Sequence, residues 1–433
     1  MSGGNNIRIM QNMNIYVDKV HFGPRDFLER FNGLSSLIGA SKREGLLFVV
    51  CLKHPFEILS SVLYIREIDG AVLLLHGDTP LSTALEIARK IQADYLLYDQ
   101  WDSIYTISEQ QMFHPPSLMQ YSSGTTGEPK LITREWRDIQ TEIENYNLAI
   151  NLSDEEQPCI LVPISHSFGL IAGVLSALYR ETPPHIIWNK NPKFALHLIQ
   201  NNPKSIVYGV PFLFQLLDSL GKDELRFHKL ISSGAPLPER LFDRLTHVSK
   251  ELRHQYGSSE TGCISIATSP SSPFDVGKPL KHIQLSFARF TEINEKESLL
   301  NEIIVTSDFQ QVNTHDIGFV SGSGSLHVIG RSDDLINVSG LKVNPAEVEN
   351  VIGKMPGVVE VAVFKQKHKV WGEAVKAIVV TSGLITEEQI KIWCMERIPS
   401  FKVPSIIELV NEIPKMPSGK LSRKLIQEWE YER

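Results

Sequence analysis

The chain has 433 residues, of which 42% are hydrophobic, so it is long enough to form two or three domains with sizeable cores. Its formal net charge of −7 argues against a sequence-independent nucleic-acid binder, which needs a clustered basic surface. No run of about twenty apolar residues and no secretory signal pattern is present, so we expect a cytoplasmic protein without a membrane span. The four cysteines lie far apart and are expected to be small buried hydrophobes.

Short apolar runs alternate with amphipathic segments through most of the chain. Strands are predicted over 45–52, 94–99, 159–164, 205–210 and 229–234, and helices over 84–92, 170–180 and 211–220. Strands that alternate with crossover helices predict an α/β fold with layers of mainly parallel sheet.

The last hundred residues follow a different pattern. Strands are predicted over 335–343, 358–366, 374–380 and 405–410, and Thr386 is expected to open a helix. Another helix begins after Asn344, with Asn344 as its cap, Pro345 in its first turn and Glu347 completing a capping box. We therefore predict a large N-terminal domain over residues 1–331 and a small, mobile C-terminal α+β domain over residues 332–433.

The segment YSSGTTGEPK, residues 121–130, has the composition of a phosphate-binding loop. Its glycines allow close backbone approach to phosphate oxygens, its hydroxyls donate hydrogen bonds, and Lys130 adds a mobile charge. The spacing differs from the GxxxxGK[ST] loop of common nucleotide hydrolases. Taken alone, a Ser/Thr/Gly cluster of this kind is more often just a polar turn.

Further motifs follow in a fixed order. They are PISHSFGL (163–170), SSGAPLP (232–238), QYGSSETG (255–262), VGKPL (276–280), NTHDIG (313–318), GRSDDLINVSGLKVNPAEVE (330–349), WGE (371–373) and IPKMPSGKLSRK (413–424). This ordered set resembles the acyl-CoA synthetase, nonribosomal adenylation domain and luciferase superfamily of adenylate-forming enzymes, from about residue 121 to the C-terminus.

The resemblance implies a reaction in two steps. A carboxylate attacks the α-phosphate of ATP and pyrophosphate leaves, after which a thiol captures the acyl-adenylate. The implied cofactors are ATP, Mg²⁺, and coenzyme A or the phosphopantetheine of a carrier protein. This chemistry depends on positioning and on neutralisation of charge.

The resemblance also assigns nucleotide-binding roles. The phosphate loop would comprise Ser122, Ser123, Gly124, Thr125, Thr126, Gly127 and Lys130. Gly234, Ala235 and Pro236 would form a wall beside adenine, Tyr256 would stack on the base next to Gly257, and Ser259 would face the α-phosphate. Asp316 would hold the ribose hydroxyls and Arg331 the ribose or phosphate.

The catalytic and hinge roles follow from the same resemblance. Glu260 would hold Mg²⁺, Lys420 would bridge the carboxylate and the α-phosphate, and Asp333 would be the hinge. Considered singly, Glu260 is also consistent with a solvated loop carboxylate, Asp316 with a turn residue, and Lys420 with part of a solvated tail.

The acid is expected to be an aryl or a small to medium acyl acid. His166 stands where acyl- and aryl-acid ligases have a histidine, and no carboxylate lies nearby to bind an α-ammonium group; a core histidine is the alternative. Residues expected to line the acid pocket are His166, Phe168, Tyr208, Val210 and Gly257, with Pro211 and Phe212 beside them.

The leading expectation for the acceptor is free coenzyme A, and the alternative is an acyl or aryl carrier protein in a biosynthetic pathway. A pantetheine tunnel is expected beside residues 338–341. The sequence departs from the family pattern at Asn301, at His315, which replaces a glycine, and at Lys342 in place of arginine. A catalytically silent homologue is disfavoured because Glu260, Asp316 and Lys420 are all present.

Overall fold

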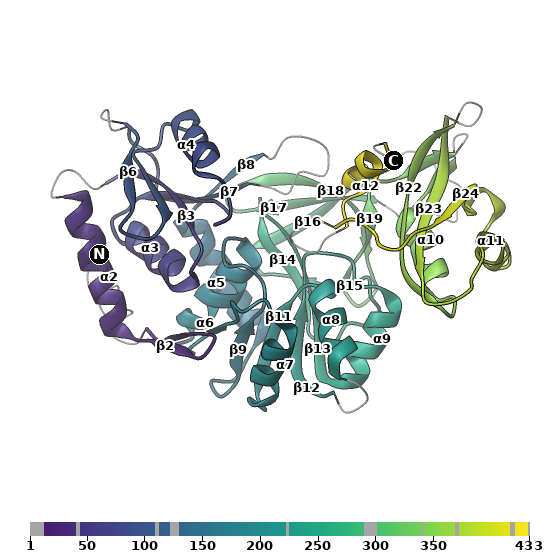
Figure 1. The fold of residues 1–433 in the computed structure, drawn as a ribbon, viewed down its shortest axis with the longest axis horizontal. Helices are drawn as coiled ribbons and strands as arrows, with labels where there is room; N and C mark the ends of the chain where they lie inside the picture. Colours follow the sequence, from purple (N-terminus) through teal and green to yellow (C-terminus); the bar gives the residue numbers. More distant parts are fainter. Residues whose placement is uncertain are drawn as a thin grey trace.

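The computed structural model describes residues 13–39, 44–108, 112–121, 130–221, 225–289, 301–338, 341–368, 372–415 and 421–431. Figure 1 shows a large body of sheets and helices that contains the N-terminal and central parts of the chain. A smaller body, built from the C-terminal segments, lies at one side of it (Figure 1). The predicted α/β fold class is confirmed.

The N-terminal part of the large body contains a six-stranded sheet of order β6-β5-β3-β4-β7-β8. Its strands are β3 (Leu47–Leu52), β4 (Ala71–Leu74), β5 (Tyr95–Asp99), β6 (Ile104–Thr106), β7 (Ser117–Tyr121) and β8 (Leu131–Glu135), and its helices are α2 (Pro24–Ile38), α3 (Pro55–Glu67) and α4 (Leu81–Lys90). β7 and β8 are antiparallel, with Tyr121 opposite Leu131. These two strands therefore flank the predicted phosphate loop.

The second sheet of the large body has thirteen strands, in the order β16-β17-β18-β19-β15-β14-β13-β12-β11-β9-β10-β1-β2. Its first half comprises β1 (Ile15–Val17), β2 (Val20–Phe22), β9 (Gln157–Ile160), β10 (His185–Ile186), β11 (Ser205–Gly209), β12 (Phe227–Ser232) and β13 (Ser249–Ser258). From β1 to β13 in space the neighbours are parallel. The connecting helices are α5 (Trp136–Ile150), the π-helix η1 (Phe168–Leu175), α6 (Ser176–Tyr179), α7 (Pro192–Gln200), α8 (Pro211–Gly221) and α9 (Glu239–Val248).

The other half of this sheet is antiparallel, which the strand–helix–strand pattern did not indicate. It comprises β14 (Gly262–Ala267), β15 (Asp275–Pro279), β16 (Ile283–Arg289), β17 (Asn301–Ser307), β18 (Gln311–Val320) and β19 (Leu326–Arg331). The antiparallel order follows from the connections: no helix separates these strands in the described residues, and strands joined by short turns pair in opposite directions.

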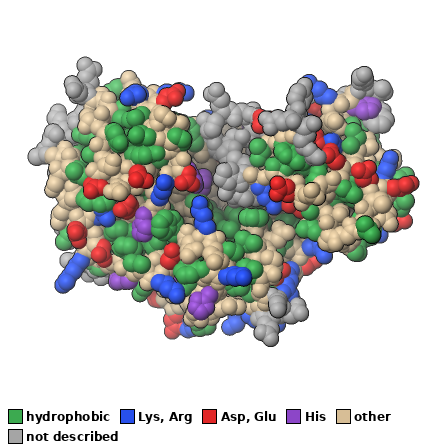
Figure 2. All heavy atoms as spheres, viewed as in Figure 1, with side chains coloured by type: hydrophobic (Ala, Val, Ile, Leu, Met, Phe, Trp, Pro, Cys, Tyr) green, Lys and Arg blue, Asp and Glu red, His purple; other side chains and the backbone are tan. Residues whose placement is uncertain are grey.

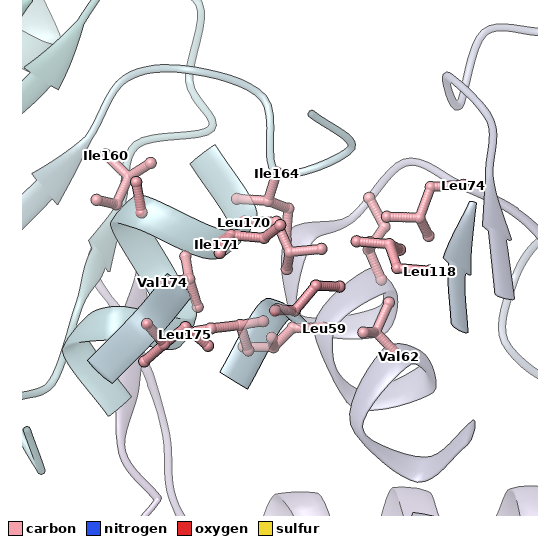
Figure 3. Packing of buried hydrophobic residues seen from close by; sticks show 14 of the residues in the cluster. Leu59, Val62, Leu74, Leu118, Ile160, Ile164, Leu170, Ile171, Val174 and Leu175 are labelled. Carbon is pink, nitrogen blue, oxygen red and sulfur yellow. The ribbon is translucent and has the colours of Figure 1, made fainter. Parts of the chain in front are cut away.

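The main core lies between the two sheets. Leu59 and Val62 of α3 pack toward Leu74 and Leu118 of the six-stranded sheet, while Val174 and its neighbours in η1 approach from the other side (Figure 3). The segment 170–180, predicted as one helix, is a π-helix followed by a short α-helix. All four cysteines are buried and free, as expected.

The C-terminal body is a separate sheet of order β21-β20-β23-β22, with β24 parallel to β23. Its elements are β20 (Ile336–Val338), β21 (Leu341–Val343), α10 (Pro345–Gly353), β22 (Val358–His368), β23 (Gly372–Thr381), α11 (Glu387–Met395), the 3₁₀ turn η3 (Ser400–Lys402), β24 (Ile406–Leu409) and α12 (Arg423–Tyr431). The single strand predicted over 335–343 is therefore a pair of short strands, because β20 and β21 are antiparallel.

Two of the three predicted features at the start of α10 are present. The side chain of Asn344 accepts a hydrogen bond from the amide of Ala346, and Pro345 lies in the first turn. The expected capping box is wrong at Glu347, because its carboxylate accepts hydrogen bonds from Lys402 Nζ, at 2.9 and 2.8 Å. An ammonium partner satisfies the carboxylate more strongly than a backbone amide does.

The two bodies touch through α9 and through the chain between them. Arg240 of α9 donates to the carbonyl of Val358 at 3.2 Å, and Glu239 pairs with Lys354 at 2.8 Å.

Acidic and basic side chains are interspersed over the face shown in Figure 2. Among the described helices, none is both long enough and apolar enough to cross a membrane.

Candidate active site

The predicted site residues gather at one edge of the thirteen-stranded sheet. β9, β11, β12 and β13 are adjacent and parallel, so their carboxyl ends meet at the same edge. The segments that follow β9, β11 and β12 contain His166, Val210 and Gly234 respectively, and Gly257 lies next to the last residue of β13. Ligands of open α/β sheets bind at such an edge, so the fold brings together motifs that lie nearly a hundred residues apart.

Tyr256, Asp316 and Arg331 form a hydrogen-bonded cluster at this edge. The Tyr256 hydroxyl donates to Asp316 Oδ2, and Arg331 Nη1 donates to Asp316 Oδ1 at 3.0 Å. The amide of Asp316 donates to Thr314 Oγ1 at 3.1 Å, and that hydroxyl donates to the carbonyl of Ile303. Side chains from β13 and β19 therefore fix the carboxylate.

Burial and charge act in opposite directions in this cluster. Burial raises the pKa of Asp316, while the Tyr256 hydroxyl and the Arg331 guanidinium oppose that shift. Burial and the Asp316 carboxylate together raise the pKa of Tyr256 well above 10, so its hydroxyl stays protonated. Burial disfavours the charged form of Arg331, but its acidic neighbours outweigh that effect and raise its pKa. The cluster is a donor–acceptor network with an ion pair at its centre.

His315, which replaces the usual glycine before the aspartate, adopts a left-handed backbone conformation with φ of 57°. Glycine adopts this region without strain, and histidine is among the residues that tolerate it. The His315 ring Nδ1 lies 2.9 Å from Glu302 Oε1, and the His315 carbonyl accepts from the amide of Ser332 at 2.8 Å. These contacts hold the unusual conformation beside Asp316.

The loop with Glu260 is a compact turn between β13 and β14. The amide of Thr261 donates to Ser258 Oγ at 3.2 Å, and Gln310 Nε2 donates to the Glu260 carbonyl at 2.6 Å. Ser259 and Glu260 are half-buried. At Gly257 a Cβ atom would lie 2.3 Å from the carbonyl oxygen of Gly262, so only glycine fits there. The turn therefore presents the Glu260 side chain on a fixed backbone.

The segment after β12 is also a turn at the site edge. Gly234 has φ of 86° and is exposed, followed by the half-buried Ala235 and the exposed Pro236. The amide of Ser233 donates to the carbonyl of Gly209 at 3.3 Å. Ser232 lies opposite His254 of β13, so this turn follows the strand next to the one that contains Tyr256. The adenine wall predicted here stays a prediction.

On the side predicted to bind the acid, the side chain of His166 is exposed. The alternative of a core histidine is therefore not supported. Phe168 is half-buried and its ring centroid lies 5.8 Å from that of Tyr208, which is fully buried. Val210 is buried, whereas Phe212 is 37% exposed and lies under Lys415 Nζ of the C-terminal body, at 4.7 Å.

Several predicted residues cannot be placed. Ser122, Ser123, Gly124, Thr125, Thr126, Gly127 and Lys420 lie outside the described residues. Lys130 is described and exposed at the start of β8. Their roles stay predictions.

The predicted hinge lies in a small network of charges. Asp333 pairs with Arg331 at 3.2 Å, and its carbonyl accepts from Lys365 Nζ at 3.3 Å. The next residue, Asp334, pairs with Arg423 of α12 at 2.7 Å. β22 and the last helix of the C-terminal body therefore both contact the segment that joins it to the large body.

The motif analysis missed Gln120, Arg134, Glu142 and Thr314, all buried near the site. Gln120 and Arg134 precede and follow the glycine-rich segment, and Glu142 lies on α5. The one sequence signal that could have identified Arg134 and Glu142 was their opposite charge, in a segment after the loop whose other residues predict burial.

Both the sequence and the fold match known proteins. Residues 58–288 match the family model described as AMP-binding enzyme, and residues 347–420 match the AMP-binding enzyme C-terminal domain. A 3,4-dihydroxybenzoate–[aryl-carrier protein] ligase of Bacillus anthracis is 44% identical over 95% of this chain and 98% of its own length. A 2-succinylbenzoate–CoA ligase of Oceanobacillus iheyensis is 27% identical over 74% of this chain and 71% of its own.

Two solved structures share the fold. ATP-bound MatB from Rhodopseudomonas palustris superposes with a TM-score of 0.84 at 18% identity, covering 98% of both chains. MenE from Bacillus subtilis, in complex with an acyl-adenylate intermediate, gives 0.81 at 20% identity, covering 97% of this chain and 96% of that one.

Proposed function

We propose, from the premise that this chain belongs to the AMP-binding enzyme family, that it activates an aromatic carboxylic acid and loads it onto a carrier protein. The chain is an AMP-forming acid:thiol ligase. The acid reacts with ATP to give acyl-AMP and pyrophosphate, and a pantetheine thiol then displaces AMP. The observation on which the choice of acid and acceptor rests is the 44% identity to the Bacillus anthracis ligase over nearly the full length of both chains.

The nucleotide side of the site fits the first step. Asp316 is held by Tyr256 and Arg331, and a carboxylate so placed accepts hydrogen bonds from the vicinal hydroxyls of a ribose. The turn after β12, with its exposed Gly234 and Pro236, follows the strand next to β13, which contains Tyr256, and this supports placing the base there. We assign the nucleotide to this edge of the sheet.

The residues also fit a magnesium ion that arrives with the nucleotide. Within the described residues no three His, Cys, Asp or Glu side chains gather to hold a metal, and Glu260 presents a single half-buried carboxylate. Magnesium in phosphoryl-transfer enzymes is bound by one or two carboxylates together with phosphate oxygens and water. When bound, the ion would offset the negative charge of the phosphates.

The acid side supports an aromatic substrate. Phe168 and Tyr208, both predicted to line the acid pocket, pack in a tilted aromatic pair; Phe168 is half-buried and Tyr208 fully buried. Aromatic rings favour such offset contacts, which a benzoate ring can extend. An α-amino acid finds no carboxylate in this segment, 163–170.

The acceptor distinguishes the two candidate functions. The sequence analysis ranked coenzyme A first, and ligases for coenzyme A are among the relatives, such as the 2-succinylbenzoate ligase at 27% identity. The greater identity of the carrier-protein ligase favours the alternative, an aryl carrier protein. Coenzyme A remains the second candidate.

The test has two stages. Acid-dependent pyrophosphate release is measured across benzoic acid, its mono- and dihydroxy derivatives, medium-chain fatty acids and amino acids. Thioester formation is then measured by mass spectrometry with a holo aryl carrier protein and with coenzyme A. We expect a hydroxybenzoate to give the highest kcat/KM and the carrier protein to be the better acceptor. If no acid releases pyrophosphate, the proposed function is wrong.

A further inference from the structure

A buried ion pair joins β8, the strand that follows the glycine-rich segment in the chain, to α5. Arg134 lies on β8, the strand that leaves the glycine-rich segment, and its Nη1 is 2.7 Å from Glu142 Oε2 of α5. The two side chains are 7% and 3% exposed. The strand that leaves the phosphate loop is thus tied to a helix of the core by charge.

The same carboxylate reaches the turn with Glu260. Glu142 Oε1 accepts a hydrogen bond from the amide of Cys263 at 2.7 Å. The preceding Gly262 has φ of 71°, and a Cβ atom there would lie 2.1 Å from Glu142 Oε2 and 2.5 Å from Arg134 Nη1. The ion pair therefore packs against the backbone only two residues after Glu260.

Burying two charges costs desolvation, so a buried pair is weak evidence for stability, but removing one partner leaves the other charge buried and unpaired. The pair joins β8, the strand that follows the glycine-rich segment, to α5, and Glu142 of α5 in turn accepts from the backbone just after the Glu260 turn.

The strand that enters the loop is anchored separately. Gln120 at the end of β7 donates to the carbonyl of Ser165 at 2.6 Å and accepts from the Ser167 hydroxyl. Ser165 and Ser167 flank His166 on the acid side. The two strands beside the loop are therefore connected to different parts of the site, β7 to the acid side and β8 to the Glu260 turn.

We propose that the Arg134–Glu142 pair is a positioning element that sets β8, the strand that follows the glycine-rich segment in the chain, against the Glu260 turn. The inference rests on the proposed function, because it assigns both segments to the nucleotide. Through Glu142, a shift of β8 displaces the backbone at Gly262 and Cys263, and with it the carboxylate of Glu260. Displacement of these segments weakens the productive binding of MgATP and leaves the acid side unchanged.

The first test compares Glu142→Gln with a matched control, Glu156→Gln. Glu156 pairs with Lys229 at 2.7 Å, their side chains are 7% and 11% exposed, and the pair lies beside β9 and β12 of the same sheet. Glu156 precedes β9, so this pair lies at the edge opposite the site. Thermal unfolding is measured for each variant, together with the KM values for MgATP and for the acid.

We expect Glu142→Gln to raise the KM for MgATP about tenfold or to lower kcat similarly, with the KM for the acid changed less than about twofold. The control should lose stability without any change in these kinetic values. A folded Glu142→Gln enzyme with the kinetics of the unmodified protein would overturn the proposal.

If Glu142→Gln does not fold, two more variants test the positioning role of the Arg134–Glu142 pair. The double substitution Arg134→Met with Glu142→Leu replaces the pair by apolar side chains, which proteins often tolerate without loss of stability. Arg134→Lys keeps the charge and loses the planar fork. We expect the double variant to fold and to bind MgATP more weakly, with Arg134→Lys intermediate. Unchanged MgATP affinity in the folded double variant contradicts the proposal.

Calorimetric titration with MgATP alone separates this inference from the proposed function. If the unmodified protein binds MgATP but no acid releases pyrophosphate, the proposed function fails while the role of the pair is still measured by the change in Kd. If the affinity is the same in the unmodified protein and in the folded double variant, the positioning role fails and the proposed function stands.

Discussion

At the scale of single residues, the site depends on one carboxylate that two donors hold in place. Asp316 is half-buried, and its two oxygens accept from Tyr256 and Arg331. Burial alone would favour the neutral acid, and the two donors counteract that effect. The same carboxylate therefore organises the protein around it, and we propose that it also accepts from the ribose hydroxyls.

We predict that Asp316→Asn raises the KM for ATP about tenfold to a hundredfold. The amide cannot form the ion pair with Arg331 and has one acceptor oxygen in place of two. Pyrophosphate release is measured as a function of ATP concentration, with Asp218→Asn as the control. Asp218 of α8 forms an ion pair of the same kind with Arg244 of α9, at 2.8 Å. Equal KM values in both variants would contradict the assignment of the ribose to Asp316.

A second residue, His254, makes stability depend on pH. Burial lowers its pKa from 6.5 to about 4, against the opposing effect of Asp275. The unfolded chain takes up a proton below pH 6.5 while the folded chain does so only near pH 4. The contribution of the neutral His254 to the free energy of unfolding is therefore fully present above pH 6.5. It is lost as the pH falls, at up to about 1.4 kcal/mol per pH unit.

Urea unfolding at pH 7, 6 and 5 tests this prediction. The free energy of unfolding of His254→Gln should fall less steeply with pH than that of the unmodified protein, by up to the same amount per pH unit. Parallel pH dependences would show that His254 is not the group responsible.

At the scale of secondary-structure elements, α12 connects the C-terminal body to the residue after the predicted hinge through an ion pair. Arg423 at its start pairs with Asp334 at 2.7 Å and with Glu349 of α10 at 2.9 Å, and it donates to the carbonyl of Val363. One side chain thus connects the last helix, the first helix of this body and the residue after the predicted hinge.

We expect Arg423→Met to destabilise the C-terminal body by about 2 kcal/mol, less than for a fully buried pair because the side chains are partly exposed. Chemical denaturation followed by fluorescence measures the change. Arg397→Met is the control, since Arg397 pairs with Glu396 at the surface, and such pairs are worth below about 1 kcal/mol. Similar losses in both variants would argue against the bridging role.

At the scale of the whole molecule, the C-terminal body contacts the acid side of the large body. Lys415 Nζ lies 4.7 Å from the centre of the Phe212 ring, just after the buried Val210. Lys415 is only five positions before Lys420 in the chain. This arrangement supports the prediction that the lysine acts on the first half-reaction from the smaller domain.

We predict that Lys420→Ala abolishes pyrophosphate release from acid and ATP, while thioester formation from a supplied acyl-adenylate stays within about tenfold of the unmodified enzyme. A lysine that bridges the carboxylate and the α-phosphate is needed only before the adenylate exists. Lys391→Ala on the exposed face of α11 is the control and should leave both reactions intact. Equal loss of both half-reactions in Lys420→Ala would refute the assignment.

Sequence reasoning identified the parts of the molecule in which local pattern determines structure. The apolar runs before the site motifs are strands, and Asn344 and Thr386 cap the helices they were expected to open. The antiparallel half of the large sheet was not predicted, because the sequence pattern of short strands without crossover helices does not indicate which strands pair with one another. The division at residue 331 stays a prediction.

The candidate site was predicted as a set of motifs and not as a set of contacts. Asp316 and Tyr256 were both named, but their hydrogen bond joins residues 60 positions apart, and no local pattern indicates it. Arg134 and Glu142 are close in the chain, yet their contact with Cys263 depends on how α5 packs on β14. Such contacts are set by tertiary packing and become visible only in the structure.

The burial of every cysteine has a consequence for an enzyme that makes an activated acyl group. An acyl-adenylate acylates thiols, and the thiolate is the reactive form. Burial raises the pKa of Cys51 and Cys394 to about 11 and that of Cys159 to about 12, and it raises the pKa of Cys263 well above its ordinary value. The enzyme therefore offers no exposed thiolate of its own to its product, so self-acylation on sulfur is suppressed and the acyl group is kept for the acceptor.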